Sequence, residues 1–194
     1  MKRLIGIDEA GRGPVIGSMF IGGVVIDEER LDELEGIGLK DSKKLDDAER
    51  ERLGDEVEAI ADAFLVREVT ATEIDELRAI MSLNKVEIRA FADIIDELEP
   101  DRAYIDLPEP DGERFGDKIR NELGRDDLDV VAEHGADDTY PIVSAASILA
   151  KNAREDHVAA LQDKYGRDFG SGYPHDTPTT DFLEDHVAEH GELP

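Results

Sequence analysis

The sequence predicts a single α/β domain built on a mixed five-stranded sheet with helices packed around it. Two apolar runs come first and are separated only by a glycine-rich turn, which predicts an antiparallel hairpin. Further strand-like runs then alternate with helical patterns, an order that is typical of sheets flanked by helices. Because 194 residues fit one domain with a full core, we expect residues 1–194 to form one unit, in which residues from about 165 to 194 are a C-terminal loop and helix appendage.

Short apolar runs bounded by glycine, proline or acidic residues predict five strands, at residues 3–8, 16–26, 63–70, 102–106 and 128–133. Helical periodicity covers residues 83–98, 113–123, 143–164 and 182–190, a segment that starts near residue 47 and, loosely, residues 27–38. Asp46 suits the N-cap of the helix near residue 47, and Thr72 suits the N-cap of a short helix. Thr177 followed by Pro178 matches an N-cap and first-turn proline for the last helix.

The net charge of the chain is strongly negative, at −27, because 49 aspartates and glutamates face 22 lysines and arginines. The acids lie between apolar positions rather than in long blocks, which favours an ordered fold over a disordered chain. A carboxylate-rich, lysine-poor surface suits a protein in molar salt, where screening weakens self-repulsion. We therefore interpret the chain as halophilic.

The absence of cysteine excludes disulfides and thiolate metal sites. No apolar run reaches 18 residues, and the N-terminus has no apolar region of the kind found in signal peptides. These features predict a cytoplasmic protein without a membrane contact.

The first strand stops on two adjacent carboxylates, Asp8 and Glu9, and is followed by Gly11, Arg12 and Gly13. Two acids at the end of a buried strand lose hydration, and that cost requires a partner such as a metal ion. The glycines offer approachable backbone N–H groups beside a guanidinium, which suits a phosphate or a sugar hydroxyl. The alternative reading is an acidic turn with a solvated arginine.

Further acids are expected at the same edge of the sheet, because Asp106 ends the fourth strand and Asp137 follows the fifth. Oxygen donors without cysteine suit a hard cation, either Mn²⁺ or Mg²⁺. Successive strand residues face opposite sides, so Asp8 and Glu9 can share one site only if the pleat breaks at Glu9. Carboxylates that hold two such cations can clamp a phosphodiester, which predicts a hydrolase or a transferase.

Five motifs together resemble the ribonuclease HII family, in its archaeal branch. They are GIDEAGRGP at 6–14, LKDSKKL at 39–45, YID at 104–106, SAASILAK at 144–151 and GSGYP at 170–174. The resemblance implies a ribonuclease H-like fold and a metal-dependent endonuclease that cleaves the RNA strand of RNA–DNA hybrids, including ribonucleotides embedded in duplex DNA. Water would attack the phosphorus on the 5′ side of the ribonucleotide and leave a 3′-hydroxyl.

The resemblance also implies the roles of the acids. Asp8, Glu9 and Asp106 should hold the cation, and Asp137 should be the fourth catalytic acid. Family members usually carry a lysine two residues before that acid, where this chain has Gly135, and Asp138 follows directly. Asp138 therefore remains an alternative for the fourth acid, and either one could be a solvated loop acid.

The substrate contacts implied by the resemblance involve two loops. Gly11, Arg12 and Gly13 should read the 2′-hydroxyl at the ribonucleotide–deoxyribonucleotide junction. Tyr173 should stack on the sugar of the following deoxynucleotide, although a tyrosine beside a proline can simply pack under a turn. Independently of the resemblance, Lys43 and Lys44 are expected to contact phosphates, because two neighbouring lysines are unusual in this lysine-poor chain, although they could be mere surface charge. Lys40, Lys151 and Arg154 are the other local cations.

Two other functions remain open from the sequence. One is another metal-dependent nuclease of the same fold, such as a junction resolvase, and the other is a non-catalytic acidic binding module. A monomer is expected, and nothing in the sequence supports a contact with a sliding clamp.

Overall fold

A computed structural model describes residues 2–39, 45–107 and 111–194. Five strands form one sheet in the order β3-β2-β1-β4-β5. The central strand β1 pairs in antiparallel fashion with β2 and in parallel with β4, while β2–β3 is antiparallel and β4–β5 is parallel. The strands are β1 (Arg3–Ala10), β2 (Met19–Asp27), β3 (Ala63–Val69), β4 (Arg102–Asp106) and β5 (Asp129–Glu133). The predicted fold class is confirmed.

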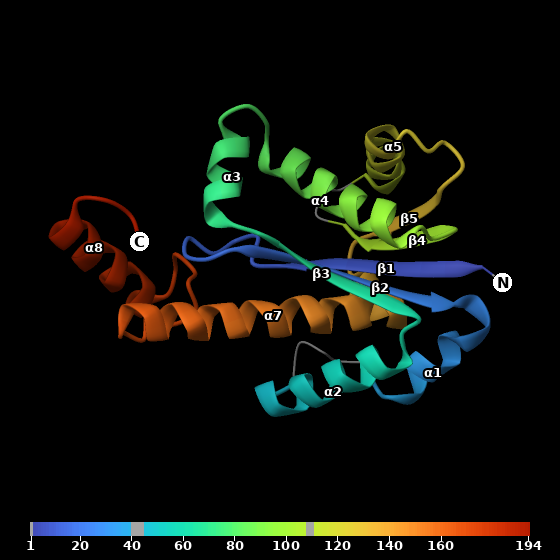
Figure 1. The fold of residues 1–194 in the computed structure, drawn as a ribbon, viewed down its shortest axis with the longest axis horizontal. Helices are drawn as coiled ribbons and strands as arrows, with labels where there is room; N and C mark the ends of the chain where they lie inside the picture. The colour runs from blue at the N-terminus through green and yellow to red at the C-terminus, as the bar shows by residue number, and fades with distance from the viewer. Residues whose placement is uncertain (1, 40–44, 108–110) are drawn as a thin grey trace.

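Helices cover both faces of the sheet (Figure 1). One face carries α3 (Ala71–Arg78), α4 (Leu83–Leu98) and α5 (Gly112–Leu123), and the other carries α1 (Leu31–Gly36), α2 (Asp47–Ile60) and α7 (Pro141–Tyr165). The remaining helical segments are η1 (Glu28–Arg30), α6 (Ala136–Thr139) and α8 (Thr177–His190). None of the helices in the described part of the chain is both long and apolar enough to cross a membrane.

Strand β2 begins at Met19, three residues later than the sequence predicts. Residues 11–18 form a loop in which Gly11 and Gly17 both have φ of +90°, a conformation that favours glycine. Ile16 leaves the sheet because it is buried in a separate apolar cluster with Phe169 and Phe182 from the C-terminal segment.

The helix caps agree only partly with the sequence. Asp46 caps α2 as predicted and accepts a hydrogen bond of 2.9 Å from the Glu49 N–H. The cap of α3 is Thr70 rather than Thr72, because β3 ends one residue earlier than expected. Helix α8 begins at Thr177 with Asp176 in the N-cap position, and the Asp176 carboxylate bonds the preceding loop instead of the helix.

Helix α7 lies directly against β1 and β2 through small residues. A Cβ atom on Gly6 would lie 2.1 Å from the Ile142 carbonyl oxygen, and one on Gly22 would lie 2.2 Å from the Ala146 carbonyl oxygen. Only glycine permits this approach of backbone to backbone. The close packing brings the first half of α7 onto the strand that ends in Asp8.

Candidate active site

Carboxylates from two neighbouring parallel strands meet at one edge of the sheet. The register of β1 and β4 pairs Ile7 with Ile105, so Asp8 and Asp106 follow side by side. The Ala136 N–H donates to Asp106 Oδ1 at 2.8 Å and ties the next residue, Asp137, to the same edge. The convergence expected from the strand ends is therefore present for Asp8 and Asp106, and Asp137 follows the residue that bonds Asp106.

Asp8 and Glu9 point to opposite faces of the sheet. The β1–β2 ladder continues through Ala10, so the break in the pleat that a shared site was expected to need does not occur. Asp8 is 4% exposed and lies on the α7 side, where the Ser147 hydroxyl is its neighbour. Glu9 lies on the α4 side beside Glu87.

Burial and mutual repulsion raise the pKa of both acids. Burial is the main cause of the raised pKa of Asp8, and the charges of Glu9 and Asp106 add to it, while the nearby Ser147 hydroxyl and the hydrogen bond from the Glu9 N–H at 2.8 Å oppose it. Burial, Glu87 and Asp106 raise the pKa of Glu9 to about 7. Ionised acids in such a setting lack sufficient counter-charge from the protein itself.

The donor chemistry of this edge fits a hard divalent cation. Glu9 Oε2 is buried and has no hydrogen-bond partner among the described residues, so it is an oxygen ligand that protein groups leave unused. Oxygen donors of this kind are preferred by Mg²⁺ and Mn²⁺. Within residues 2–39, 45–107 and 111–194, no three Asp, Glu, His or Cys side chains are already gathered as a complete ligand set.

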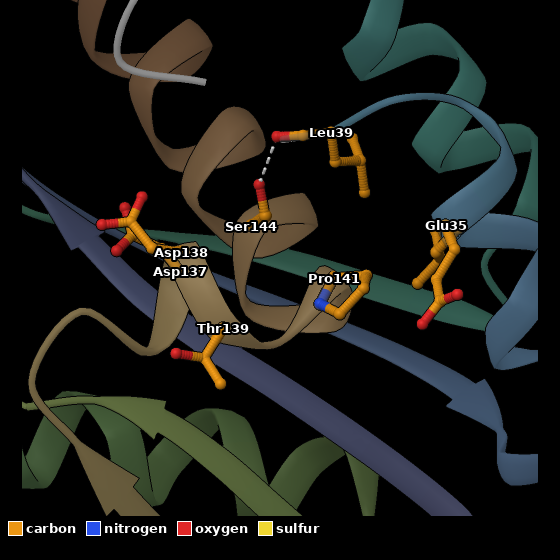
Figure 2. Close-up of a pocket in the computed structure, with 8 residues that line it drawn as sticks. Glu35, Leu39, Asp137, Asp138, Thr139, Pro141 and Ser144 are labelled. Atoms are coloured by element: carbon orange, nitrogen blue, oxygen red, sulfur yellow. Dashed lines mark hydrogen bonds between the residues drawn. The ribbon is translucent and has the colours of Figure 1, made fainter. Parts of the chain in front are cut away.

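Asp137 lies in a small pocket between α6, α7 and the segment that follows α1 (Figure 2). Asp137 is 7% exposed, whereas Asp138 is exposed, and both carboxylates point away from Glu35. The pocket volume of about 20 Å³ suits a water molecule and is too small for a nucleotide. The substrate must therefore approach from outside this pocket.

The basic segment at residues 40–44 lies outside the described residues, and with it Lys43 and Lys44. Leu39, the last described residue before it, is held in place because the buried Ser144 hydroxyl donates to the Leu39 carbonyl oxygen at 2.9 Å (Figure 2). Ser144 belongs to α7, so this helix contacts both the acid edge and Leu39.

The loop at residues 11–13 packs against the loop that carries Tyr173. A Cβ atom on Gly11 would lie 2.6 Å from the Ser18 carbonyl oxygen, and one on Gly13 would lie 3.2 Å from Tyr173 Cε1. The Val15 N–H also donates to the Gly172 carbonyl oxygen at 2.8 Å. The two loops that the sequence singled out as substrate contacts are thus in direct contact with each other.

Arg12 is held by helix α4. Its Nε donates to Glu87 Oε2 at 3.2 Å, and its Nη2 donates to Asn84 Oδ1 at 2.7 Å. The Glu87 side chain is completely buried; it pairs with Arg12, and its charge raises the pKa of Glu9. Sequence reasoning missed both Asn84 and Glu87, and the available signal was an acid flanked by the core residues Val86 and Ile88.

Comparison with known proteins decides the family. The family model described as Ribonuclease HII matches residues 5–193. The chain belongs to the ribonuclease HII family. A ribonuclease HII of Methanothrix thermoacetophila is 44% identical over 194 residues, which are 100% of this chain and 92% of that protein.

Solved structures agree with the family. The ribonuclease H2 of Pyrococcus horikoshii OT3 superposes with a TM-score of 0.92 at 42% identity and covers 99% of this chain and 90% of that one. The ribonuclease HII in a complex with PCNA from Archaeoglobus fulgidus has a TM-score of 0.91 at 40% identity, covering 100% and 92%. The resemblance seen in the sequence motifs is confirmed.

Membership of the ribonuclease HII family establishes the class of reaction. The chain is a metal-dependent hydrolase, an endonuclease that acts on the RNA strand of RNA–DNA hybrids. The acidic edge and the two loops in contact are the parts of this chain where that chemistry and substrate recognition have to be sought.

Proposed function

We propose that this ribonuclease HII cleaves at single ribonucleotides embedded in duplex DNA as well as in long RNA–DNA hybrids. The observation that carries the proposal is the contact between the Gly13 loop and Tyr173, 3.2 Å from a Cβ position on Gly13. A loop that hydrogen-bonds the 2′-hydroxyl, next to an aromatic ring that stacks on the following sugar, can recognise one ribonucleotide and the deoxynucleotide after it in a single site.

Asp8, Glu9 and Asp106 are the residues assigned to hold the cation, either Mn²⁺ or Mg²⁺. Asp8 and Glu9 leave β1 on opposite faces, but the charge of Asp106 raises the pKa of both, which supports one shared site at the end of the strand without a break in the pleat. When bound, such a cation stabilises the charge that develops on the scissile phosphate and activates water. Asp106 is oriented by the Ala136 N–H, and Asp8 by the Glu9 N–H. These bonds keep both carboxylates directed to the edge of the sheet before substrate arrives.

Asp137 is assigned as the fourth catalytic acid, which takes the proton of the attacking water. Its burial and its place next to the Ala136 N–H that binds Asp106 support this choice over the exposed Asp138. Water then attacks the phosphorus on the 5′ side of the ribonucleotide, and the bond from phosphorus to the upstream 3′-oxygen breaks. That oxygen takes a proton from solvent and becomes the 3′-hydroxyl of the upstream product, while the phosphate stays on the ribonucleotide.

Substrate recognition is assigned to the two loops and to the basic segment. Gly11, Arg12 and Gly13 read the 2′-hydroxyl, and Tyr173 stacks on the sugar that follows. Lys43 and Lys44, which lie outside the described residues, are assigned to the phosphates. Among partner proteins a sliding clamp is the first to test, because the A. fulgidus relative was solved with PCNA. A monomer in the cytoplasm is the proposed working form.

The decisive experiment compares a duplex that contains one ribonucleotide with the same duplex made only of DNA, in the presence of Mn²⁺. We expect cleavage of the first on the 5′ side of the ribonucleotide and none of the second. Cleavage of the all-DNA duplex would favour a junction resolvase, and cleavage of a long hybrid alone would contradict the proposed reading of single ribonucleotides.

The same assay over a KCl series tests the salt adaptation. A protein of charge −27 repels a polyanion, and salt screens that repulsion as well as the self-repulsion of the fold. We expect this gain to exceed the loss of local phosphate contacts, so that cleavage and folding measured by circular dichroism rise from about 0.1 M to beyond 1 M KCl. Highest activity and stability at the lowest salt would show that the surface is not an adaptation to salt.

A further inference from the structure

One buried cation lies where the two substrate loops meet. Arg154, on α7, is 8% exposed although the chain is strongly acidic and has few cations. A buried guanidinium is costly unless its N–H groups are bonded. Arg154 Nη2 donates to the Ser171 carbonyl oxygen at 2.5 Å, and Nη1 donates to Glu155 Oε1 at 2.9 Å. The sequence suggested a nucleic-acid contact for Arg154, but its strongest contacts are inside the protein.

Arg154 contacts both loops. On one side its Cδ lies 3.4 Å from a Cβ position on Gly11, in the loop that reads the 2′-hydroxyl. On the other side its guanidinium carbon lies 5.2 Å from the centre of the Tyr173 ring, within the range of a cation–π interaction. The bond to Ser171 fixes the backbone two residues before that ring.

The loop around Tyr173 is held firmly at its other contacts. Asp176 Oδ2 accepts two hydrogen bonds of 2.7 Å from Ser171, one from the N–H and one from the hydroxyl. The Gly172 N–H donates to the buried Thr179 hydroxyl at 3.0 Å. The backbone thus has several anchors, whereas the cation contact of the Tyr173 ring comes from Arg154.

We propose that Arg154 is a positioning residue that holds the Tyr173 ring against the Gly11–Gly13 loop and thereby favours substrates with a single embedded ribonucleotide. The proposal rests on the proposed function, in which Tyr173 stacks on the substrate. A ring already fixed loses less conformational freedom when it stacks. A long hybrid offers a ribonucleotide at every position and can bind in many registers, so it depends less on this one contact.

The test is a double-mutant cycle of Arg154→Lys and Tyr173→Ala, with KM and kcat measured on the single-ribonucleotide duplex and on a long hybrid. Lysine keeps the charge but lacks the planar fork that faces the ring. We expect Arg154→Lys to raise KM for the single-ribonucleotide duplex about 5–10-fold, or about 1.0–1.4 kcal/mol, with kcat changed less than about twofold. The effect on the long hybrid should be smaller.

In the Tyr173→Ala background the same Arg154→Lys change should alter KM less than about twofold, because the ring it positions is gone. A KM increase of equal size in both backgrounds would overturn the proposal and assign Arg154 to a direct phosphate contact. If Tyr173→Ala alone leaves KM unchanged on both substrates, the proposed role of Tyr173 fails, and the role of Arg154 fails with it.

A matched control separates this role from a general effect of arginine removal. Arg120, on α5, also donates to a nearby carboxylate, Asp117, at 2.7 Å and to a backbone carbonyl, that of Leu128, at 3.4 Å. Arg120→Lys should leave the ratio of KM values for the two substrates unchanged. Thermal midpoints from circular dichroism show that each variant is folded, and a changed ratio in Arg120→Lys would contradict the proposal.

Discussion

The two faces of the central sheet are packed in different ways near the acid edge. On the α7 face, Gly6 and Gly22 let helix backbone lie directly on strand backbone. On the α4 face the sheet meets large side chains, and a Cβ atom on Gly23 would lie 2.5 Å from a methyl group of Ile94 rather than from a backbone atom. Since Asp8 lies on the first face and Glu9 on the second, each acid has a different kind of neighbourhood.

Two consecutive acids of one strand therefore have different neighbours, one set on each face of the sheet. On the α7 face, Asp8 is flanked by small residues and by the Ser147 hydroxyl. On the α4 face, Glu9 faces a second acid, Glu87, whose charge is paired with Arg12. The tight face supports its acid through close packing, whereas on the other face the nearest charged side chain, Glu87, repels the acid.

The largest expected effect tests whether both faces serve the reaction. Asp8→Asn and Glu9→Gln should each lower kcat by about 10²-fold or more, because an amide cannot supply the negative charge that a cation requires. Asp129→Asn is the matched control, an exposed acid at the start of β5 that pairs with Arg102 at 3.0 Å. Near-normal turnover in Glu9→Gln at saturating Mn²⁺ would restrict the reaction to the α7 face.

The second prediction concerns two adjacent glycines of β2. Gly22→Ala should cost about 3 kcal/mol of unfolding free energy, because the Ala146 carbonyl cannot move without shifting α7. Gly23→Ala should cost about 1 kcal/mol, because the Ile94 side chain can adjust and alanine suits a strand better than glycine.

Urea unfolding at fixed KCl measures this difference. Gly36→Ala in α1 is the control, since a Cβ atom there meets nothing within 4 Å, and it should change stability by less than about 0.5 kcal/mol. Equal losses for the two β2 variants would mean that the faces are equally deformable.

The smallest expected effect is on the pH dependence of the metal-free protein. The pKa of Glu9 is raised from 4.5 to about 7, so between these values the folded state keeps a proton that the unfolded state has lost. The unfolding free energy should therefore fall as pH rises through this range, on the order of 1–3 kcal/mol. The raised pKa of Asp8 acts in the same direction.

Glu9→Gln removes the Glu9 contribution and should lose less stability than the wild type between pH 5 and pH 8, in the presence of EDTA. Unfolding curves at each pH, recorded at one KCl concentration, provide the comparison. Parallel pH profiles for the two proteins would show that the folded state does not raise the pKa of Glu9.

Much of the fold could be predicted because the apolar runs are short and clearly bounded. The strand Arg102–Asp106 was predicted with its observed ends, since its apolar residues stop at an acid. Ile16 was assigned to a strand because its neighbours in the sequence are apolar. Its true partners, Phe169 and Phe182, lie 153 and 166 residues further along the chain, and no local pattern shows them.

The candidate site was predictable only where strand ends determine it. Parallel strands bring their ends to one edge, so the proximity of Asp8 and Asp106 could be expected from the sequence. The pairing of Arg12 with Glu87 depends on α4 packing on the same face of the sheet as Glu9, and no sequence pattern predicts which helix packs there. The contacts of Arg154 could not be predicted for the same reason, because the loop at residues 168–176 folds back onto it.

Helix α7 also sets a fixed spacing between the proposed metal site and the proposed substrate loop. Ser147, beside Asp8, and Arg154, beside Tyr173, are seven residues apart, close to two full turns or about 10 Å along the axis. Both therefore lie on the same side of one continuous helix. The helix between Ser147 and Arg154 can accept substitutions but no insertion or deletion. One residue more or fewer would rotate Arg154 by about 100° about the helix axis, away from the loop that it contacts.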